Sequence, residues 1–394
     1  MTTKTQPPFR AEHVGSLHRP KALRDARLRL LGGPGAKGRP ADHVNEELRR
    51  IEDQCVREAV KLQEAVGLRT ITDGEFRRQT WLGEFVGCMT GMDISISVVK
   101  DAASRTGFRS DERIGKSTTE DVENVRVEFT VTGRIRWKQS VNVEPFRFLS
   151  SITNGVPKVT IPAPANFYFF GGPQCIDRKV YPDLAQFWSD LSDVYRKEVQ
   201  VLVDAGCRHI QIDDVVPAML CDPGHVAKIR ERGDDPQAIL SANTECLNRA
   251  LKERHDDLLV SVHMCRGNRH GHFMAQGGYE PIADYLFNAL EVDNWYLEYD
   301  SPRAGTFEPL RFMPADRTVV LGLMTTKRAE LESVDQLRAR VEDASKFVPL
   351  ERLSLSPQCG FSGDMMSDVM SIEQQKRKLE RLVEAARAIW PDAS

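Results

Sequence analysis

Short β-rich segments that end in polar residues alternate with helical stretches along almost the whole chain. This alternation limits the possible folds more than any other feature of the sequence. Eight such segments occur, at the region ending with 13–16 and at 69–75, 158–164, 209–214, 258–265, 294–300, 318–324 and 352–359. Strands separated by helices form parallel sheets, and eight of them can close into a barrel. The sequence therefore predicts an α/β fold, the (β/α)8 TIM barrel.

Apolar residues at helical spacing fill most of the gaps between these segments. The clearest stretches are 44–66, 183–205, 236–254, 334–347 and 372–389. Gly67 and Gly206 follow two of them, which is typical of helix C-termini. A doubly wound open sheet is the competing topology. No GxGxxG follows the first strand, which argues against a dinucleotide-binding version of that sheet but does not exclude other open sheets.

Residues 83–143 interrupt the alternation. They include the alternating run 125–133 (VRVEFTVTG), which is followed directly by 134–143 (RIRWKQSVNV). Alternating runs of this kind are typical of a β-hairpin. We therefore expect residues 1–394 to form one barrel domain, with a hairpin insertion at about 83–143, after the second strand, that caps one end of the barrel.

Charge and hydropathy exclude several classes of partner. The chain has 54 Lys+Arg against 57 Asp+Glu, a formal net charge of -3, so nothing favours nucleic acid or a membrane surface as a partner. No window approaches 18 apolar residues and the first ten residues are polar, which predicts no membrane span and no signal peptide. The expected location is cytoplasmic, where the eight cysteines would be thiols.

Polar residues gather at the predicted strand ends, where a barrel carries its active site. His263 and Cys265 are two residues apart in an extended segment, so they point to the same side. Glu298 ends the sixth segment and Cys359 the last. A His/Cys/Cys set with one carboxylate suits zinc and disfavours magnesium or calcium. A single HxC pair also arises by chance, and a lone cysteine such as Cys359 is more often a small buried hydrophobe.

Other residues that bind metal elsewhere have simpler interpretations here. The tract 266–272 (RGNRHGH) contains two more histidines and is interpreted as a solvated loop. The remaining cysteines are interpreted as structural thiols, namely Cys55, Cys88, Cys175, Cys207, Cys221 and Cys246.

Several of these segments match the motifs of one known family, and in the same order. The segments are HVGS, TDGEFRR, IQIDD, HMCRGN, YLEYDSPRAG and SPQCGFS, spread over residues 10–389. Together they resemble the catalytic, C-terminal barrel of cobalamin-independent methionine synthase, and more closely its short single-barrel methyltransferase relatives. The larger synthase has a second, N-terminal barrel, for which this chain has no room.

The resemblance implies a function and a site. It implies transfer of a methyl group from 5-methyltetrahydrofolate, or its polyglutamate form, to homocysteine through a zinc-bound thiolate, giving methionine. It implies zinc ligands at His263, Cys265, Glu298 and Cys359. It further implies that the first-strand loop, with His13, Gly15 and Ser16, meets the amino-acid part of the thiol, and that Glu75 and Asp213 hold its ammonium group.

The chain departs from the family at the donor side. Where the synthase has a histidine general acid after the seventh strand, this chain reads GLMTTKR, which makes Lys327 the candidate catalytic residue together with Asp213. Where the synthase has a stacking tryptophan, the chain has an aromatic segment that includes Phe167. We expect the alkyl donor to dock against Phe167 and Arg134.

Three other functions remain open. The departures suit a different alkyl transfer on the same zinc barrel, such as that of epoxyalkane:coenzyme M transferases, which needs no folate site. A zinc-free barrel of the uroporphyrinogen decarboxylase type shares the architecture but does not use the His/Cys/Glu/Cys set. A non-enzymatic thiol- or zinc-binding module is the third. Donor, acceptor, direction of transfer and oligomeric state do not follow from the sequence.

Overall fold

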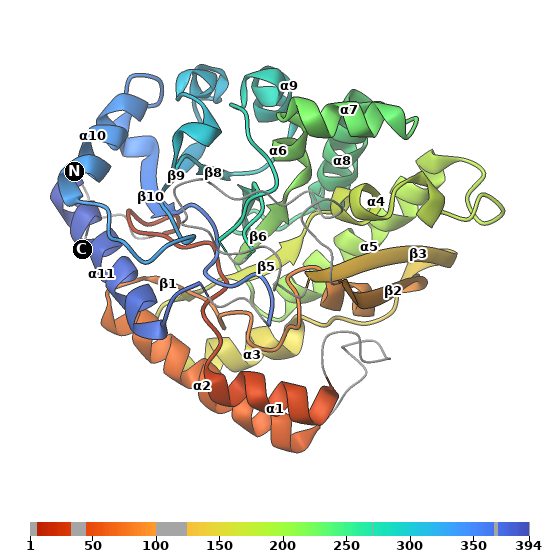
Figure 1. Ribbon diagram of the computed structural model, residues 1–394, viewed down its shortest axis with the longest axis horizontal. Helices are drawn as coiled ribbons and strands as arrows, with labels where there is room; N and C mark the ends of the chain where they lie inside the picture. The colour runs from red at the N-terminus through yellow and green to blue at the C-terminus, as the bar shows by residue number, and fades with distance from the viewer. Residues whose placement is uncertain (1–5, 33–44, 100–123, 270, 366–368, 394) are drawn as a thin grey trace.

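A computed structural model describes residues 6–32, 45–99, 124–269, 271–365 and 369–393. At its centre is a sheet of six parallel strands in the order β10-β9-β8-β7-β6-β5 (Figure 1). These strands are β5 (Val159–Pro162), β6 (His209–Asp214), β7 (Leu259–Met264), β8 (Asn294–Glu298), β9 (Thr318–Met324) and β10 (Leu353–Pro357). Sequential order across a sheet is that of a barrel wall, whereas a doubly wound sheet reverses its order near the middle.

The first two predicted strands complete the arrangement less regularly. β1 (Thr70–Ile71) pairs in parallel with β4 (Val156–Pro157), which leads directly into β5. The first segment joins the other edge of the sheet, since Glu12 N donates to Leu355 O at 2.8 Å. Between the first segment and β1, Leu17 N donates to Gly74 O at 3.1 Å. The parallel α/β sheet is confirmed, and its closure into a complete (β/α)8 barrel stays a prediction.

Helices surround the sheet and begin at recognisable capping residues (Figure 1). Ser333 and Ser371 each form a capping box, which satisfies backbone N–H groups in the first turn of a helix. Gly67 and Gly206 follow α2 and α5 with φ of 93° and 98°, as their sequence context predicts. The helices are α1 (Lys21–Leu31), α2 (Glu46–Ala65), α3 (Val143–Ile152), α4 (Ala165–Gly171), α5 (Leu184–Asp204), α6 (Val216–Leu220), α7 (Pro223–Glu231), α8 (Pro236–Leu251), α9 (Glu280–Ala289), α10 (Val334–Ala344) and α11 (Ile372–Ile389).

The predicted hairpin is present, but its arms are not the two runs identified in the sequence. The first run and the start of the second, up to Trp137, belong to one strand, β3 (Asn124–Trp137), whose antiparallel partner is the earlier strand β2 (Met89–Val99). Gly133 does not form a turn. It lies in β3 beside a bulge at Gly91, where a Cβ would meet the carbonyl oxygen of Arg134 at 2.4 Å. The connection between the arms falls at 100–123, outside the described residues.

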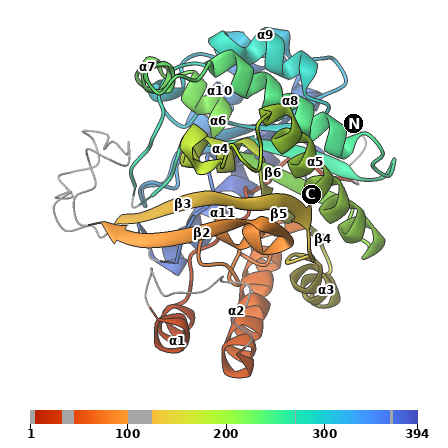
Figure 2. The same cartoon turned by 90° about the vertical axis from the view of Figure 1, so that its right-hand side faces the viewer.

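The hairpin lies across one side of the molecule, between α4 on one side and α1 and α2 on the other (Figure 2). β3 packs against α4 and α5. This placement brings the hairpin to the side of the sheet where the polar strand ends gather. No helix among the described residues is long and apolar enough to cross a membrane.

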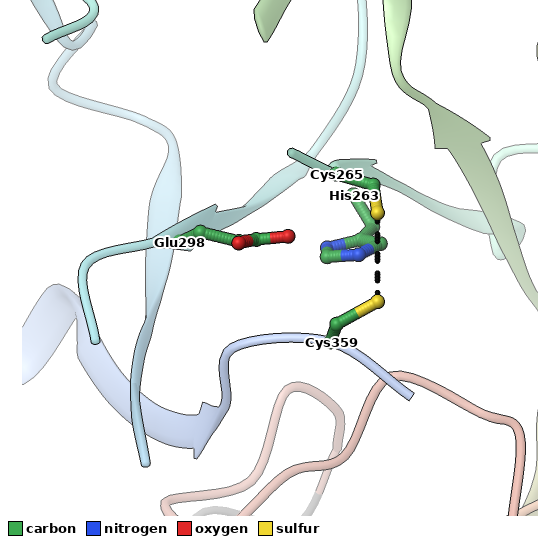
Figure 3. A group of neighbouring side chains, drawn as sticks. All are labelled: His263, Cys265, Glu298 and Cys359. Carbon is green, nitrogen blue, oxygen red and sulfur yellow. Dashed lines mark hydrogen bonds between the residues drawn. The ribbon is translucent and has the colours of Figure 1, made fainter. Parts of the chain in front are cut away.

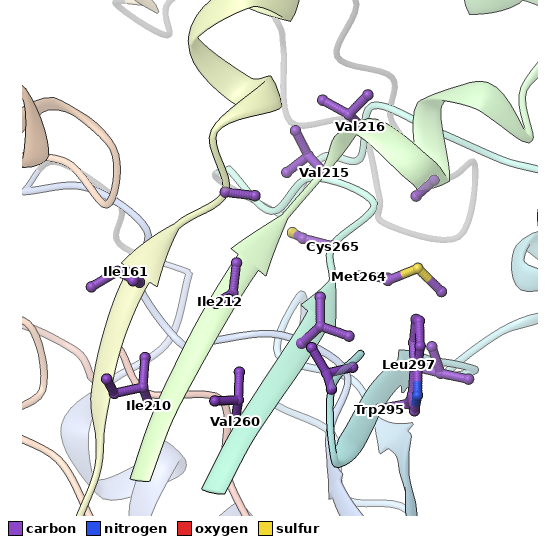
Figure 4. Packing of buried hydrophobic residues seen from close by; sticks show 14 of the residues in the cluster. Ile161, Ile210, Ile212, Val215, Val216, Val260, Met264, Cys265, Trp295 and Leu297 are labelled. Carbon is purple, nitrogen blue, oxygen red and sulfur yellow. The ribbon is translucent and has the colours of Figure 1, made fainter. Parts of the chain in front are cut away.

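The strands are buried on both faces, and the two faces differ in chemistry. On β6, Ile210 and Ile212 pack into the apolar core with Val260 and Trp295 (Figure 4). Gln211, between the two isoleucines, points to the opposite side and lies fully buried among polar groups. The sheet therefore has an apolar helix-facing layer and a polar interior that leads to the strand ends.

Candidate metal centre

The ends of two neighbouring parallel strands and the segment after β10 bring four ligand groups together. His263 lies near the end of β7 with Cys265 just beyond it, Glu298 ends β8, and Cys359 follows β10 by two residues. One donor atom from each lies within 4.8 Å of all the others. The two sulfur atoms are 3.5 Å apart (Figure 3). The structure thus gathers the four residues that the sequence proposes as metal ligands.

These side chains have unused donor atoms, which is the test of whether a metal fits. His263 is within hydrogen-bonding reach of the backbone of Tyr296, so one ring nitrogen of the neutral imidazole stays without a partner. Glu298 accepts one bond at Oε1, from the backbone N of Arg266 at 2.8 Å, while its buried Oε2 has none. Buried polar atoms are nearly always satisfied, so these unused atoms fit a bound cation. Nitrogen, oxygen and two sulfurs form a donor set that zinc takes tetrahedrally.

Burial also sets the protonation of the group. It lowers the pKa of His263 to about 3, which keeps the imidazole neutral and able to bind metal. The hydrogen bond to Cys359, followed by burial, raises the pKa of Cys265 well above its usual value, and burial raises that of Glu298. Without a cation the site disfavours its anionic forms, so a divalent ion would supply the charge that these ligands need.

A cavity of about 910 Å³ opens beside the four ligands. His263, Cys265 and Cys359 line its inner end. Its wall also carries side chains from the first segment, the β1 loop, β3, α4 and α7. Among them are Ser16, Glu75, Trp81, Phe129, Phe169, Phe170, Asp213, Lys228, Arg232 and Met274. The volume is typical of sites for small organic ligands.

Two carboxylates lie on this wall. Glu75 has a φ of 62°. It is the only non-glycine residue with a positive φ among the described residues. Its Oε1 accepts from the Thr160 hydroxyl at 2.9 Å, and its buried Oε2 has no partner. Burial, and then the nearby charge of Glu75, raises the pKa of Asp213 to about 8. A carboxyl group with this pKa is largely protonated at neutral pH, so a cationic ligand group would favour its ionised form beside Glu75. Strain at Glu75 is typical of functional sites.

The first-strand loop meets this carboxylate pair, although its three predicted residues differ in position. Ser16 lines the cavity. Gly15 has a φ of 151°, and a Cβ there would lie 2.7 Å from Thr160 Cγ2 and 3.3 Å from Glu75 Oε1. His13 lies deeper, fully buried, with Nε2 3.2 Å from the carbonyl oxygen of Thr70, and does not line the cavity. The loop therefore approaches the carboxylates with its glycine and serine.

The structure does not bring the two predicted donor-side residues to the cavity. Arg134 forms an ion pair with Asp190 at 2.8 Å and stacks on Tyr181, away from the wall. Phe167 is fully buried in the core, where its ring packs edge-on against Phe129 at 5.1 Å. The neighbouring aromatics of the same short helix, Phe169 and Phe170, line the cavity instead.

The sequence also missed the cationic wall on α7. Lys228 on α7 and Arg232, the residue directly after α7, line the cavity. Arg232 pairs with Asp234 at 2.6 Å through Nε, while its buried Nη2 has no hydrogen-bond partner. The basic spacing in 228–232 is the signal that could have identified them, since residues four apart lie on one helix face.

Lys327 lies close enough to influence the metal ligands. Its side chain is buried, and its Nζ has no hydrogen-bond partner. Its positive charge lowers the pKa of Glu298 and Cys265 against the stronger effects that raise them. Lys327 does not line the cavity.

The tract 266–272 is not the solvated loop that its composition suggests. Arg266 is fully buried, with its guanidinium 4.3 Å from the centre of the Tyr279 ring, and Arg269 and His272 are also buried. Stacking on an aromatic ring replaces part of the lost hydration of the cation. His270 lies outside the described residues. The six other cysteines are buried, as interpreted, although Cys175 contributes to the cavity wall.

Comparisons with known proteins agree with this arrangement. Residues 172–388 match the family model described as "Cobalamin-independent synthase, Catalytic domain". The chain is 36% identical over 390 residues to the uncharacterized protein YxjG of Bacillus subtilis, covering 98% of this chain and 96% of that one.

Solved structures show the same relationship. A candidate vitamin-B12 independent methionine synthase from Listeria monocytogenes has a TM-score of 0.71 and 32% identity, over 98% of this chain and 99% of that one. A B12-independent methionine synthase from Shewanella, solved with selenomethionine, has a TM-score of 0.68 at 20% identity over 97% of each chain, which shows a shared fold. The chain therefore belongs to the cobalamin-independent methionine synthase family, through the catalytic domain of that family.

Proposed function

We propose that this chain transfers a methyl group to a thiol at a zinc centre, on a closed (β/α)8 barrel. In the form that we favour, the donor is 5-methyltetrahydrofolate or its polyglutamate, the acceptor is homocysteine and the product is methionine. The observation that carries the proposal is the gathering of four donor atoms within 4.8 Å of one another at the inner end of a cavity.

The zinc ligands in this proposal are His263, Cys265, Glu298 and Cys359. Zinc bound there would lower the pKa of an incoming thiol and so keep its sulfur nucleophilic at neutral pH. Oε2 of Glu298, which accepts no hydrogen bond, and the unused ring nitrogen of the neutral His263 support this assignment.

The chain's own residues would bind and orient the thiol. Glu75 and Asp213 accept hydrogen bonds from its ammonium group, and Ser16 borders its carboxylate end. Fixing both ends of the amino acid holds the sulfur at one position near the ligands, and such positioning contributes to rate. The structure of the Shewanella synthase with selenomethionine, the selenium analogue of methionine, supports an amino-acid ligand on this fold.

The outer part of the cavity would take the methyl donor. Phe169 and Phe170 offer faces for a flat ring, and the cationic side chains of Lys228 and Arg232 lie nearby, on α7 and directly after it. At about 910 Å³ the cavity has room for a second molecule beside a thiol amino acid. We assign this role to these residues in place of Phe167 and Arg134.

Lys327 is proposed to supply positive charge, or a proton, near the ligands. Its buried Nζ has no partner, and it stands where the larger synthases have a histidine acid. This difference also favours a second candidate function. Zinc-dependent alkyl transfer to or from another thiol, as in epoxyalkane:coenzyme M transferases, requires no folate and no such histidine.

A substrate comparison separates the two. Purified protein reconstituted with zinc is given 5-methyltetrahydrofolate with homocysteine, and separately epoxypropane with coenzyme M, and methionine and the thioether are quantified. We expect methionine in the first reaction. Formation of the thioether without methionine would favour the second function. If neither product forms, both functions are ruled out.

A further inference from the structure

We propose that two cations, the buried Lys158 and the partly buried Arg78, hold the carboxylate pair Glu75–Asp213 as an acceptor for the ammonium group of the thiol substrate. Each cation acts through one neutral side chain and does not touch the substrate. This inference rests on the proposed function, because it concerns the binding of an aminothiol at that site.

The first cation reaches Asp213 through a glutamine. Lys158 is 2% exposed, and its Nζ donates to the backbone carbonyl of His13 and, at 2.8 Å, to Gln211 Oε1. Gln211 Nε2 in turn donates to Asp213 Oδ1 at 2.7 Å. An ammonium group can only donate, so it fixes the amide with its oxygen toward Lys158 and its N–H toward the carboxylate.

The second cation reaches Glu75 through a threonine. Arg78 NH1 donates to Thr160 Oγ1 at 2.9 Å, and its NH2 donates to Thr160 O at 2.6 Å. Thr160 Oγ1 donates to Glu75 Oε1 at 2.9 Å, whereas the direct approach of Arg78 to Glu75 is 3.8 Å. A guanidinium also only donates, so the hydroxyl must turn its proton toward Glu75. On the neighbouring strands β5 and β6, a cation therefore orients a neutral side chain so that it donates a hydrogen bond to a carboxylate.

This arrangement leaves room for a substrate. Glu75 and Asp213 line the cavity, whereas Lys158 and Arg78 do not. One oxygen of each carboxylate accepts from the relay, and Glu75 Oε2 stays buried without a partner. A cation in direct contact would occupy the place of the ammonium group. A cation behind a neutral donor reduces the repulsion between the two carboxylates, while Glu75 Oε2 keeps no protein partner and can accept from a ligand.

The test compares two thiols that differ only in the ammonium group. Binding of homocysteine and of 4-sulfanylbutanoate, which lacks the amino group, is measured by calorimetry on zinc-reconstituted protein. In Lys158→Met and Arg78→Met we expect the dissociation constant for homocysteine to rise roughly tenfold, while that for 4-sulfanylbutanoate changes less than about twofold. Lys378→Met is the matched control, because Lys378 is a buried lysine outside the cavity wall.

If the variants bind both thiols more weakly to the same extent, Lys158 and Arg78 have only structural roles and the inference is overturned. A wild-type protein that does not bind homocysteine more tightly than 4-sulfanylbutanoate would also overturn it. If a methionine variant does not fold, Thr160→Val and Gln211→Leu interrupt the relays with both cations in place, and the same loss of preference is expected. Failure of the proposed function is separate: a wild type that prefers homocysteine but forms no methionine leaves the inference standing.

Discussion

Of the four proposed metal ligands, His263, Cys265 and Glu298 are buried and Cys359 is partly buried. His263 and Glu298 also keep buried polar atoms that lack a hydrogen-bond partner. Burial keeps His263 neutral and opposes the charged forms of Cys265 and Glu298. Such a site is poor as a structural core and well suited to a divalent cation. Its chemistry therefore follows from individual residues before any substrate is considered.

Replacing one sulfur ligand tests this directly. Cys359→Ser removes a thiolate, and we expect the bound zinc and the rate of methionine formation each to fall at least about tenfold, since ligand loss strongly reduces zinc affinity. Metal analysis and product quantification measure both. Cys246→Ser, at a buried cysteine outside the cavity wall, should retain zinc and rate. A fully zinc-loaded, fully active Cys359→Ser would contradict the assignment.

The close approach at Gly15 gives a second prediction. In Gly15→Ala the new methyl group meets Thr160 and Glu75, so we expect the KM for homocysteine to rise about tenfold and the free energy of unfolding to fall by about 1–2 kcal/mol. Steady-state kinetics and urea denaturation measure these. Gly206→Ala has a comparable positive φ with nothing within 4 Å, and should lose stability without a change in KM. An unchanged KM in Gly15→Ala would argue against this placement of Glu75.

The raised pKa of Asp213 predicts a pH-dependent stability. Its carboxyl has a pKa of about 8 in the folded protein and about 4 when unfolded, so between these values the folded state binds the extra proton and stability falls as pH rises. Asp213→Asn removes this loss. In zinc-free protein we expect the variant to gain at least about 1 kcal/mol over wild type between pH 4 and pH 8, measured by urea denaturation. If the difference in the free energy of unfolding between Asp213→Asn and wild type does not grow as the pH rises, the raised pKa of Asp213 is contradicted.

Among the elements, the short helix α4 and the hairpin form the outer cavity. Phe169→Ala shortens the aromatic wall, and we expect the KM for the methyl donor to rise about tenfold while the KM for homocysteine stays within about twofold. Phe148→Ala, on α3 outside the cavity, is the control. Equal effects on both substrates would argue against a donor site at α4.

The sequence predicted secondary-structure elements best where a single pattern determines the structure of a segment. The alternation of β-rich and helical segments predicted the parallel sheet, and strand-end positions predicted the meeting of His263, Cys265 and Cys359. The arms of the hairpin were not predictable from the run 125–143, because a bulge at Gly91 lets β3 continue past Gly133. The sequence does not show that Phe169, rather than Phe167, faces the cavity. A helix of about two turns has too little periodicity to show which side faces the cavity.

For the molecule as a whole, parallel strands place residues distant in sequence at one edge of the sheet. Glu298 and Cys359 approach β7 because β8, β9 and β10 follow it in order. The polar interior below them holds Lys158 and Gln211, which connect the core to the cavity. These long-range contacts could not be predicted from sequence patterns, because no local spacing shows which interior residues will meet.

Metal content decides whether these four side chains form a zinc site. Wild type and His263→Ala are purified, reconstituted with zinc, freed of excess metal and analysed, with circular dichroism to confirm that both are folded. We predict about one zinc per wild-type chain and less than about a tenth of that in the variant, because each ligand contributes strongly to binding. A folded wild type that holds no zinc, or a folded variant that holds a full equivalent, would contradict the assignment of the site.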